Sequence, residues 1–455
     1  MENKVKAFQK SIQEKTVSVI GIGISNRPLI KFLLSCGARV TAHDKKTKET
    51  LGAVAEELEA LGVTLFLGDS YLDDIPGSVV FKTPGMRFDH PALLSAKERG
   101  AEITSEMEVF FELCPAKILA VTGSDGKTTT TTLIHKMLTK AGYKTHLGGN
   151  IGMPLLAEVE SITKDDYVVL ELSSFQLHTM KKSPSIAVMT NITPNHLDMH
   201  KDYQEYIDAK KNIMLYQGKE DILVVNAQNA VTKEIGEAAK GELRSFSRES
   251  DAQICLKDGA IYYGDEEILK TEDIKLPGKH NIENYMAAIG AVYGIVPKDV
   301  IVESANTFGG VEHRIELVRT LDVVRFYNSS IDSSPNRTIN TLNVFTEPVV
   351  LIAGGKDKGI AYDEIGEPIV NHVKALILIG ATSQVIYNAT RSAMEKTGNY
   401  LPVYFETAYQ DAVERAKDLA QAGDVVLLSN ASTSFDMFQN FEQRGNLFKE
   451  LVHKL

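Results

Sequence analysis

The residues best suited to chemistry lie in one glycine-punctuated stretch, Thr122-Gly123-Ser124-Asp125-Gly126-Lys127-Thr128-Thr129. An apolar run precedes this stretch and a helical pattern follows it, so backbone N–H groups should converge at a helix N-terminus, where anions bind. Lys127 adds a positive charge and Thr128 a hydroxyl that suits Mg²⁺. The strict Walker pattern would have its first glycine at residue 121, where valine stands, so this is a shortened GxxGKT loop. We predict that it binds a triphosphate, in preference to being a plain strand-to-helix turn with a solvated lysine.

Carboxylate, imidazole and amine groups follow this loop along the chain. Glu171 ends an apolar strand, where open α/β sheets hold their ligands, and its oxygens suit Mg²⁺. His196 and His200 stand four residues apart, but a zinc hydrolase needs glutamate directly after the first histidine, where Leu197 stands. Lys210 lies in a helical run. Singly, these residues could be a surface carboxylate, a loop cap and an exposed lysine, but their order after the loop favours one shared metal site.

A second nucleotide signal stands near the N-terminus. The run Gly21-Ile22-Gly23-Ile24-Ser25-Asn26 follows the first predicted strand, and Asp44 ends the second. This is most of a dinucleotide fingerprint, but Asn26 stands where the third glycine belongs. Two interpretations stay open: an NAD site, and a site where the diphosphate of UDP lies on the helix N-terminus.

The elements that position these groups are short β-branched runs that alternate with helical stretches, which predicts an α/β fold with parallel sheets. We expect three domains: a Rossmann-like domain over residues 1–110, a central mononucleotide-binding ATPase domain of the P-loop type over 111–309, and a second Rossmann-like domain over 310–455. The run Gln253–Leu269 alternates and turns at Asp258-Gly259, as an antiparallel hairpin does. The other predicted strands are Thr16–Gly21, Arg39–Asp44, Val79–Thr83, Lys117–Val121, Tyr167–Leu172, Ser185–Asn191, Asp221–Asn226, Val323–Tyr327, Val349–Ala353, Ala375–Gly380 and Asp424–Leu428, with a helix near Asn281–Tyr293.

Length and composition agree with a folded multidomain enzyme. The chain has 455 residues, more than one hydrophobic core supports, and 43% hydrophobic and 24% charged residues exclude wholesale disorder, a collagen-like chain and a membrane bundle. A formal net charge of −11 argues against nucleic acid as a partner. Three cysteines without a CxxC pair argue against a disulfide framework, and no secretory signal or membrane-spanning run is visible. We therefore expect a cytoplasmic protein.

Taken together, the motifs resemble those of the Mur ligase family, the ATP-dependent amino-acid-adding enzymes of peptidoglycan synthesis. The runs Glu171–Leu177 (ELSSFQL) and Phe438–Gly445 (FQNFEQRG) are similar to those of the members that add D-glutamate, whereas folylpolyglutamate synthases share the generic loop. The other landmarks, which extend the resemblance over essentially the whole chain, are Gly149–Gly152, Asn195–His200, Ala209-Lys210, His280–Asn284, Gly310–Arg314 and Gly354–Gly359.

The resemblance implies a reaction and its participants. ATP would phosphorylate the carboxylate of UDP-N-acetylmuramoyl-L-alanine, and the amine of D-glutamate would attack the acyl phosphate. It implies two Mg²⁺ ions, a monomer, and catalytic roles for Lys127, Glu171, His196 and Lys210. Because a lysine cation should repel Mg²⁺, the resemblance further implies that Lys210 is carbamylated and so becomes a carboxylate ligand.

The resemblance also implies three binding sites and a metal site. The residues for ATP are Gly123, Ser124, Asp125, Gly126, Lys127, Thr128, Thr129, Asn281, Asn284 and Arg314. Those for the UDP-sugar are Ser25, Asn26, Asp44, Gly85, Asn150, Ser173 and Gln176. Those for the amino acid are Lys358, Ser434 and Phe435, and those for metal are Thr128, Glu171, His196 and Lys210.

One segment departs from the family pattern. The usual NDSKATN is replaced by Asn328-Ser329-Ser330-Ile331-Asp332-Ser333-Ser334, followed by Pro335. Ser329 thus replaces an aspartate that contacts the nucleotide, and Ile331 replaces a lysine that helps to hold the amino-acid carboxylate. Asp332 could supply the acid instead, and Arg337 or Lys356 the cation. Three alternatives therefore stay open: a Mur-type ligase for another amino acid, a folylpolyglutamate-synthase-like ligase, and a nucleotide-binding regulatory or scaffold protein on the same fold.

Overall fold

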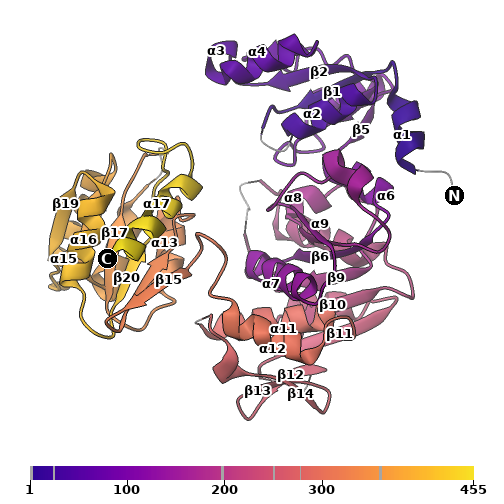
Figure 1. The fold of residues 1–455 in the computed structure, drawn as a ribbon. Helices are drawn as coiled ribbons and strands as arrows, with labels where there is room; N and C mark the ends of the chain where they lie inside the picture. Colours follow the sequence, from indigo (N-terminus) through magenta and orange to yellow (C-terminus); the bar gives the residue numbers. More distant parts are fainter. Residues whose placement is uncertain (1–3, 24–25, 196–198, 250–251, 277, 358–360) are drawn as a thin grey trace. The chain divides into compact units, whose positions relative to one another are not determined.

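The computed structural model describes residues 4–23, 26–195, 199–249, 252–276, 278–357 and 361–455. The chain forms two compact units, one of residues 1–274 with 280–306 and one of residues 275–279 with 307–455 (Figure 1). Two sheets lie in the first unit and one in the second, and these three mainly parallel sheets confirm the predicted α/β class. Among the described residues, no helix is both long and apolar enough to cross a membrane.

The first sheet has five parallel strands in the order β3-β2-β1-β4-β5. The order reverses between β1 and β4, so the loops that follow these two strands flank a topological switch point, where such sheets bind ligands. The sequence missed β3 and β5, which are short edge strands with exposed residues. The elements are α1 (Lys4–Ile12), β1 (Thr16–Ile20), α2 (Asn26–Ser35), β2 (Arg39–Asp44), α3 (Lys48–Leu51), α4 (Ala53–Ala60), β3 (Thr64–Leu67), β4 (Val79–Phe81), α5 (Pro91–Glu98), β5 (Glu102–Thr104) and α6 (Glu106–Leu113).

The second sheet has nine strands in the order β14-β13-β12-β11-β10-β9-β6-β8-β7. Its strands pair in parallel from β7 to β12, and β12, β13 and β14 pair antiparallel, which confirms the predicted hairpin. The strands are β6 (Lys117–Thr122), β7 (Thr145–Gly149), β8 (Tyr167–Glu171), β9 (Ile186–Met189), β10 (Ile222–Asn226), β11 (Glu242–Ser247), β12 (Ile254–Lys257), β13 (Ala260–Tyr263) and β14 (Glu266–Lys270). The helices are α7 (Lys127–Lys140), η1 (Leu156–Ser161), α8 (Ser174–Leu177), α9 (Tyr203–Leu215), α10 (Ala230–Gly236), η2 (Thr271–Asp273), α11 (Lys279–Val292) and α12 (Lys298–Thr307).

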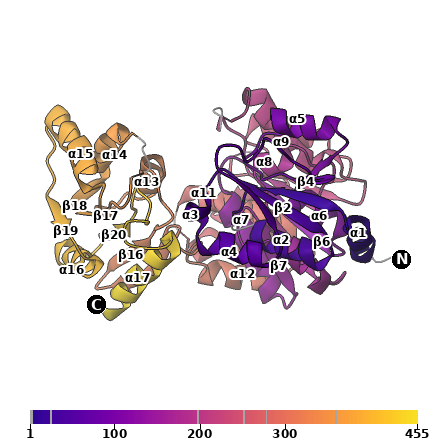
Figure 2. The ribbon, with the colours of Figure 1, turned by 90° about the horizontal axis from the view of Figure 1, so that it is seen from above.

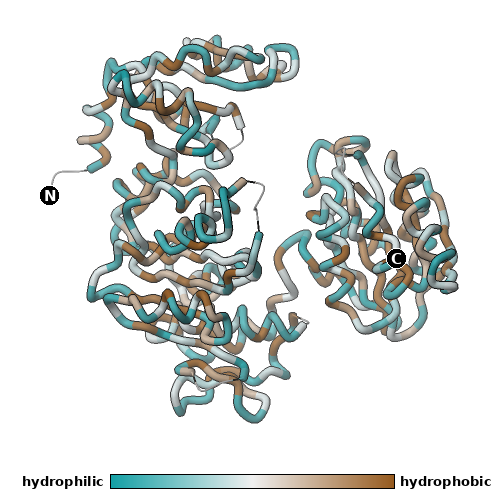
Figure 3. The backbone as a smooth tube through the Cα atoms, turned by 180° about the vertical axis from the view of Figure 1, so that it is seen from behind, coloured by the Kyte–Doolittle hydropathy of each residue, from teal (hydrophilic) through white to brown (hydrophobic). Residues whose placement is uncertain are grey.

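The third sheet has six strands in the order β15-β16-β20-β17-β18-β19, all parallel except β15. Alternate residues of β17 enter two different cores, because successive side chains of a strand point to opposite faces. Helices α13, α14 and α15 cover one face and α16 and α17 the other (Figure 2). Brown apolar and teal hydrophilic stretches alternate along the backbone (Figure 3). The elements are β15 (Glu316–Leu321), β16 (Val324–Asn328), α13 (Pro335–Leu342), β17 (Val349–Ala353), η3 (Asp363–Ile365), α14 (Gly366–His372), β18 (Val373–Ile379), α15 (Ser383–Thr397), β19 (Val403–Glu406), α16 (Tyr409–Leu419), β20 (Val425–Leu428) and α17 (Phe441–Lys454).

Candidate active site

The predicted phosphate loop joins β6, a central strand of the second sheet, to the N-terminus of α7. Gly123 and Gly126 have φ angles of +154° and +76°, which glycine adopts far more readily than other residues. A Cβ at Gly123 would also collide with the hydroxyl of Thr190, and one at Gly126 with the side-chain oxygen of Asn284. Both positions therefore require glycine, because of the backbone conformation and because Thr190, directly after β9, and Asn284 of α11 approach closely.

A residue at the end of the neighbouring strand holds this loop. The side-chain oxygen of Asn191 accepts hydrogen bonds from the backbone N–H groups of Ser124 (3.2 Å) and Asp125 (2.8 Å). The backbone oxygen of Asn191 accepts a second bond from the Ser124 N–H at 2.8 Å. The Lys127 ammonium folds back and donates to the Ser124 carbonyl at 3.0 Å. Asn191 was not predicted as a site residue, although its place at the carboxyl edge beside β6 is a signal that could have identified it.

Three of the predicted residues meet beside the loop. Glu171, the last residue of β8, is only 2% exposed. Its carboxylate accepts hydrogen bonds from the Thr128 hydroxyl at 2.6 Å and from the Asn150 amide at 2.9 Å. Hydroxyl and carboxylate oxygens are ligands that Mg²⁺ prefers, so the pairing of Thr128 with Glu171 fits the implied metal. The described residues contain no group of three or more His, Cys, Asp or Glu side chains that could hold a metal by themselves, and His196 lies outside them.

Lys210 also reaches the phosphate loop, from α9. Its amine donates to the Gly123 carbonyl at 2.8 Å and lies over the ring of Tyr206, 4.7 Å from the centroid. The side chain is 2% exposed, so the simple interpretation as an exposed helix lysine is wrong. Burial, with a smaller contribution from the charge of Lys127, holds the pKa of Lys210 well below its usual value. The neutral form of this amine is therefore reached at a lower pH than in an exposed lysine.

Helix α11 brings the two predicted asparagines to the first turn of α7. The Asn284 oxygen accepts from the Thr130 hydroxyl at 3.3 Å, and its amide nitrogen donates to Asn281 at 2.9 Å. Both asparagines are 5% exposed. Their place beside Gly126 is compatible with the implied nucleotide site.

Ser173 and Gln176 have a clear local role. The Ser173 hydroxyl accepts the Gln176 N–H at 3.3 Å, and the Gln176 side-chain oxygen accepts the Ser173 N–H at 3.0 Å. This reciprocal capping box starts the short helix α8. It places both side chains directly after Glu171 and Leu172, at the same edge of the sheet.

In the first sheet, the predicted UDP-sugar residues surround the turn after β1. The Asn26 amide donates to the carbonyls of Ile20 (3.1 Å) and Gly21 (2.8 Å). The Asp44 carboxylate accepts from the N–H groups of Ile22 (2.7 Å) and Lys46 (2.9 Å). Gly85 follows β4, on the other side of the switch point, and Ser25 lies outside the described residues.

In the second unit, the segment that departs from the family pattern is packed inward. Ser329 is fully buried, and its hydroxyl accepts the Ile315 N–H at 3.3 Å. The Asp332 carboxylate is 5% exposed and accepts from the hydroxyls of Thr341 (2.7 Å) and Ser429 (2.8 Å). Asp332 is thus occupied inside the fold and is poorly placed to replace the missing acid.

The candidate cations have different surroundings. Arg337, in the first turn of α13, is exposed and donates to the carbonyl of Ile331 at 3.1 Å. Ile331 occupies the position where the family pattern has lysine. Lys356, after β17, is exposed and its backbone pairs with Thr433. Ser434 is buried and Phe435 is 61% exposed, both in the loop after β20. These loops follow the neighbouring parallel strands β16, β20 and β17, so they share one edge of the third sheet. Of the other predicted residues, Arg314 is exposed in this unit, and Lys358 lies outside the described residues.

Sequence reasoning missed two further clusters. Arg444, in the FQNFEQRG run, is fully buried and donates to the Ser330 hydroxyl (2.9 Å), the Ser330 carbonyl (2.7 Å) and the Ser432 carbonyl (3.1 Å). The motif thus holds together the loops after β16 and β20. The arginine of this motif was the signal that could have indicated a buried hydrogen-bonding role. An ion-pair cluster of Arg87, Asp89 and Glu205 in the first unit has no spacing pattern that could have identified it.

Comparison with known proteins agrees with this geometry. The Mur ligase middle domain family matches residues 121–292, and the Mur ligase, glutamate ligase domain family matches residues 313–431. Proteins named UDP-N-acetylmuramoylalanine–D-glutamate ligase are 53% identical to this chain in Acetivibrio thermocellus and 52% identical in Ruminiclostridium cellulolyticum, in both cases over 100% of each chain.

A solved structure shares the fold. The UDP-N-acetylmuramate–alanine ligase of Thermotoga maritima aligns with a TM-score of 0.59 over 97% of this chain and 100% of its own, at 19% identity. That likeness concerns the fold alone. On the full-length identities and the two domain matches, the chain belongs to the Mur ligase family and, within it, groups with the UDP-N-acetylmuramoylalanine–D-glutamate ligases.

Proposed function

We propose that the chain is an ATP-dependent ligase that adds D-glutamate to UDP-N-acetylmuramoyl-L-alanine through an acyl phosphate. The full-length relatives carry the corresponding name. The observation that supports this chemistry best is the meeting of Thr128, Glu171 and Lys210 around one glycine loop. Such a site brings metal-binding oxygens to the place where a triphosphate would lie.

The proposed reaction has two steps. A carboxylate oxygen of the nucleotide-sugar attacks the γ-phosphorus of ATP and ADP leaves. The amine of D-glutamate then attacks the acyl carbon, phosphate leaves, and the nitrogen loses its extra proton. Both steps bring anions together, so the Lys127 ammonium and the N-terminus of α7 would stabilise the charge that develops on the transferred phosphoryl group. Bound Mg²⁺ would neutralise phosphate charge, with Thr128 as one ligand and Glu171, His196 and Lys210 around a second ion.

The metal role of Lys210 requires a change of its charge. We propose that the neutral amine adds to CO₂ and releases a proton, which leaves a carbamate with ligand oxygens. Burial and the lowered pKa support this, because only the unprotonated amine is a nucleophile. Mass spectrometry of the intact active enzyme should show the mass of one added CO₂, which Lys210→Arg should lack. Unmodified Lys210 in active, metal-loaded enzyme would contradict the proposal.

The two substrates are proposed to lie at different sheet edges. Ser25, Asn26, Asp44 and Gly85 would bind the uridine diphosphate at the switch point of the first sheet, and Asn150, Ser173 and Gln176 the rest of the sugar nucleotide. Lys358, Ser434 and Phe435 would bind D-glutamate. Because Ile331 cannot bind a carboxylate, Arg337 or Lys356 would replace the missing cation. We further propose that the enzyme is a cytoplasmic monomer.

Phosphate release tests this function. Release should require ATP, Mg²⁺, UDP-N-acetylmuramoyl-L-alanine and D-glutamate together, and Lys127→Ala should abolish it. The matched control is Lys136→Ala, an exposed position on the same helix, which should retain activity. Turnover with L-glutamate, L-lysine or glycine but not with D-glutamate would refute the named amino acid, and ATP binding without amide formation would favour a regulatory protein.

A further inference from the structure

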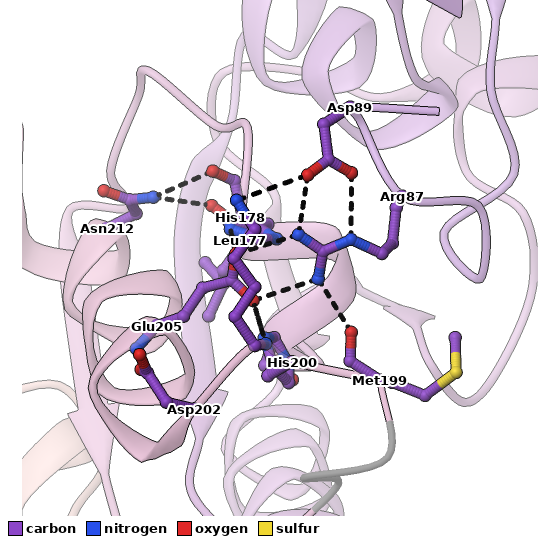
Figure 4. Close-up of polar contacts among 11 residues, drawn as sticks. Arg87, Asp89, Leu177, His178, Met199, His200, Asp202, Glu205 and Asn212 are labelled. Atoms are coloured by element: carbon purple, nitrogen blue, oxygen red, sulfur yellow. Dashed lines mark hydrogen bonds and ion pairs between the residues drawn. The ribbon is translucent and has the colours of Figure 1, made fainter. Parts of the chain in front are cut away.

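Arg87, in the loop after β4, has a guanidinium group whose five N–H groups all meet an acceptor (Figure 4). Nε and Nη2 donate to the two oxygens of Asp89, both at 2.9 Å. Nη2 and Nη1 donate to the two oxygens of Glu205 at 2.9 and 3.0 Å, and Nη1 also donates to the Met199 carbonyl at 2.8 Å. A bidentate pair fixes the plane of a guanidinium as well as its position. The Asp89 pair fixes the guanidinium within its own loop, and the Glu205 pair together with the Met199 contact joins that loop to the segment around α9.

These segments come from distant parts of the first unit. Arg87 and Asp89 directly follow Gly85, which the proposed function assigns to the UDP-sugar. Glu205 lies in the first turn of α9, and Met199 precedes that helix. The same helix carries Lys210 to the phosphate loop. One guanidinium thus joins the loop after β4 to the helix that reaches the proposed metal site.

Two histidines extend the cluster toward α8. The Glu205 carboxylate lies 3.5 Å from His200 Nδ1 and 3.8 Å from His178 Nε2. His200 Nε2 is 2.9 Å from the Ser174 hydroxyl, and its ring stacks on Phe175 at 5.2 Å. The cluster therefore also touches the short helix that begins with Ser173 and contains Gln176.

The same groups surround a small pocket. It is lined by Lys82, Gly85, Arg87, Phe175, His178 and His200, among others. Phe88 packs edge-on against His178 at 4.7 Å, which adds an apolar contact between the loop after β4 and α8. A displacement of this loop would consequently disturb the Arg87–Glu205 ion pair and the Phe88–His178 contact at once.

We propose that Arg87 is a positioning residue that couples binding of the sugar nucleotide at the loop after β4 to binding of metal at the phosphate loop. The inference rests on the proposed function. Arg87 acts through Asp89 and the Gly85 loop on one side and through Glu205 and α9 on the other. Ligand at either site would favour the same arrangement of the shared cluster, so each ligand would make binding of the other tighter.

Isothermal titration of the full chain with UDP-N-acetylmuramoyl-L-alanine tests this coupling. The titration is done with and without Mg²⁺ in the presence of a non-hydrolysable ATP analogue, and the ratio of the two dissociation constants is the coupling factor. In the wild type Mg²⁺ should tighten binding, and in Arg87→Met the factor should fall by roughly tenfold, within the usual range for coupled sites. Arg87→Lys should show a partial loss. The control is Arg99→Met. Arg99 is an exposed arginine directly after α5 that donates to the Ser95 hydroxyl and the Ile75 carbonyl, and its replacement should leave the coupling factor unchanged.

The outcomes separate positioning from simple stabilisation. A purely structural role would lower the melting temperature and the active fraction while the factor stayed the same, and that result would overturn the inference. If Arg87→Met does not fold, Glu205→Gln removes the same charge pair with little change in shape and should give the same fall. Normal binding and turnover in a wild type with no coupling would overturn this inference alone, whereas a wild type that does not bind the sugar nucleotide would remove the proposed function with it.

Discussion

Arg87 in the first unit and Arg444 in the second both anchor several segments, but by different physics. The Arg87 side chain is 27% exposed and donates mainly to carboxylates, which raise its pKa. Arg444 is fully buried, donates to neutral oxygens of Ser330 and Ser432, and has its pKa lowered, chiefly by burial. The first is a charge-based contact that depends on the ionisation of its partners. The second depends on hydrogen bonds that water cannot replace.

The largest expected effect is on Arg444. Arg444→Met would leave the buried carbonyls of Ser330 and Ser432 without a donor, so we expect a loss of about 3–5 kcal/mol in the free energy of unfolding of the second unit. Hydrogen exchange of β16 and β20 measures this locally. Arg391→Met, at a well-exposed i,i+4 pair with Glu395 in the same unit, should change the stability by less than about 0.5 kcal/mol. Equal effects at the two sites would contradict the comparison.

A smaller effect is expected for Arg87. Arg87→Met should destabilise the first unit by about 1–2 kcal/mol, because its partners can regain water when the guanidinium is lost. Urea denaturation measures this change in stability, and hydrogen exchange of the α9 amides measures it locally. Arg99→Met is the control. A loss of stability larger than that caused by Arg444→Met would contradict the comparison, because it would show that the Arg87 cluster behaves as a buried contact.

Acid should weaken the Arg87 cluster specifically. The hydrogen bonds from Arg87 lower the pKa of Asp89 and of Glu205 to about 2 each. Because folding lowers both pKa values, the stabilisation is complete above the unfolded pKa values near 4 and is lost as pH falls toward 2. The stability difference between wild type and Arg87→Met should therefore shrink by about 1 kcal/mol between pH 5 and pH 2.5. The difference caused by Arg444→Met should not shrink in this way.

Salt should give the smallest effect. Raising NaCl from 0.1 to 1 M screens partly exposed charges, so the contribution of Arg87 should fall by a few tenths of a kcal/mol. The contribution of Arg444 should stay constant, since its acceptors are neutral and buried. Denaturation midpoints of both variants at the two salt concentrations measure the difference, and an equal salt response would remove the distinction.

Local patterns were sufficient for much of the fold and the site. The apolar runs at β6, β8 and β17 were predicted within one residue at each end, since buried parallel strands are continuous hydrophobic segments. The edge strands β3, β5 and β19 were missed because exposed residues interrupt their patterns. The glycine loop and Glu171 lie together at one edge of the second sheet, as their places at the ends of predicted strands led us to expect.

Other features required the folded chain. The burial of Lys210 depends on the loop and the tyrosine that pack over it, and no helical pattern in α9 encodes those neighbours. The engagement of Asp332 by Thr341 and Ser429 likewise could not be judged from the replaced motif alone.

The amino-acid sequence by itself determined the fold class and the place of the glycine loop between a strand and a helix, because each follows from short contiguous patterns. Only the tertiary structure decided that Arg87 meets Glu205, 118 residues away, and that Arg444 meets Ser330, 114 residues away. Such contacts depend on how whole sheets and helices pack. A side chain's partners and its access to water are properties of that packing, and they decide its charge and its role.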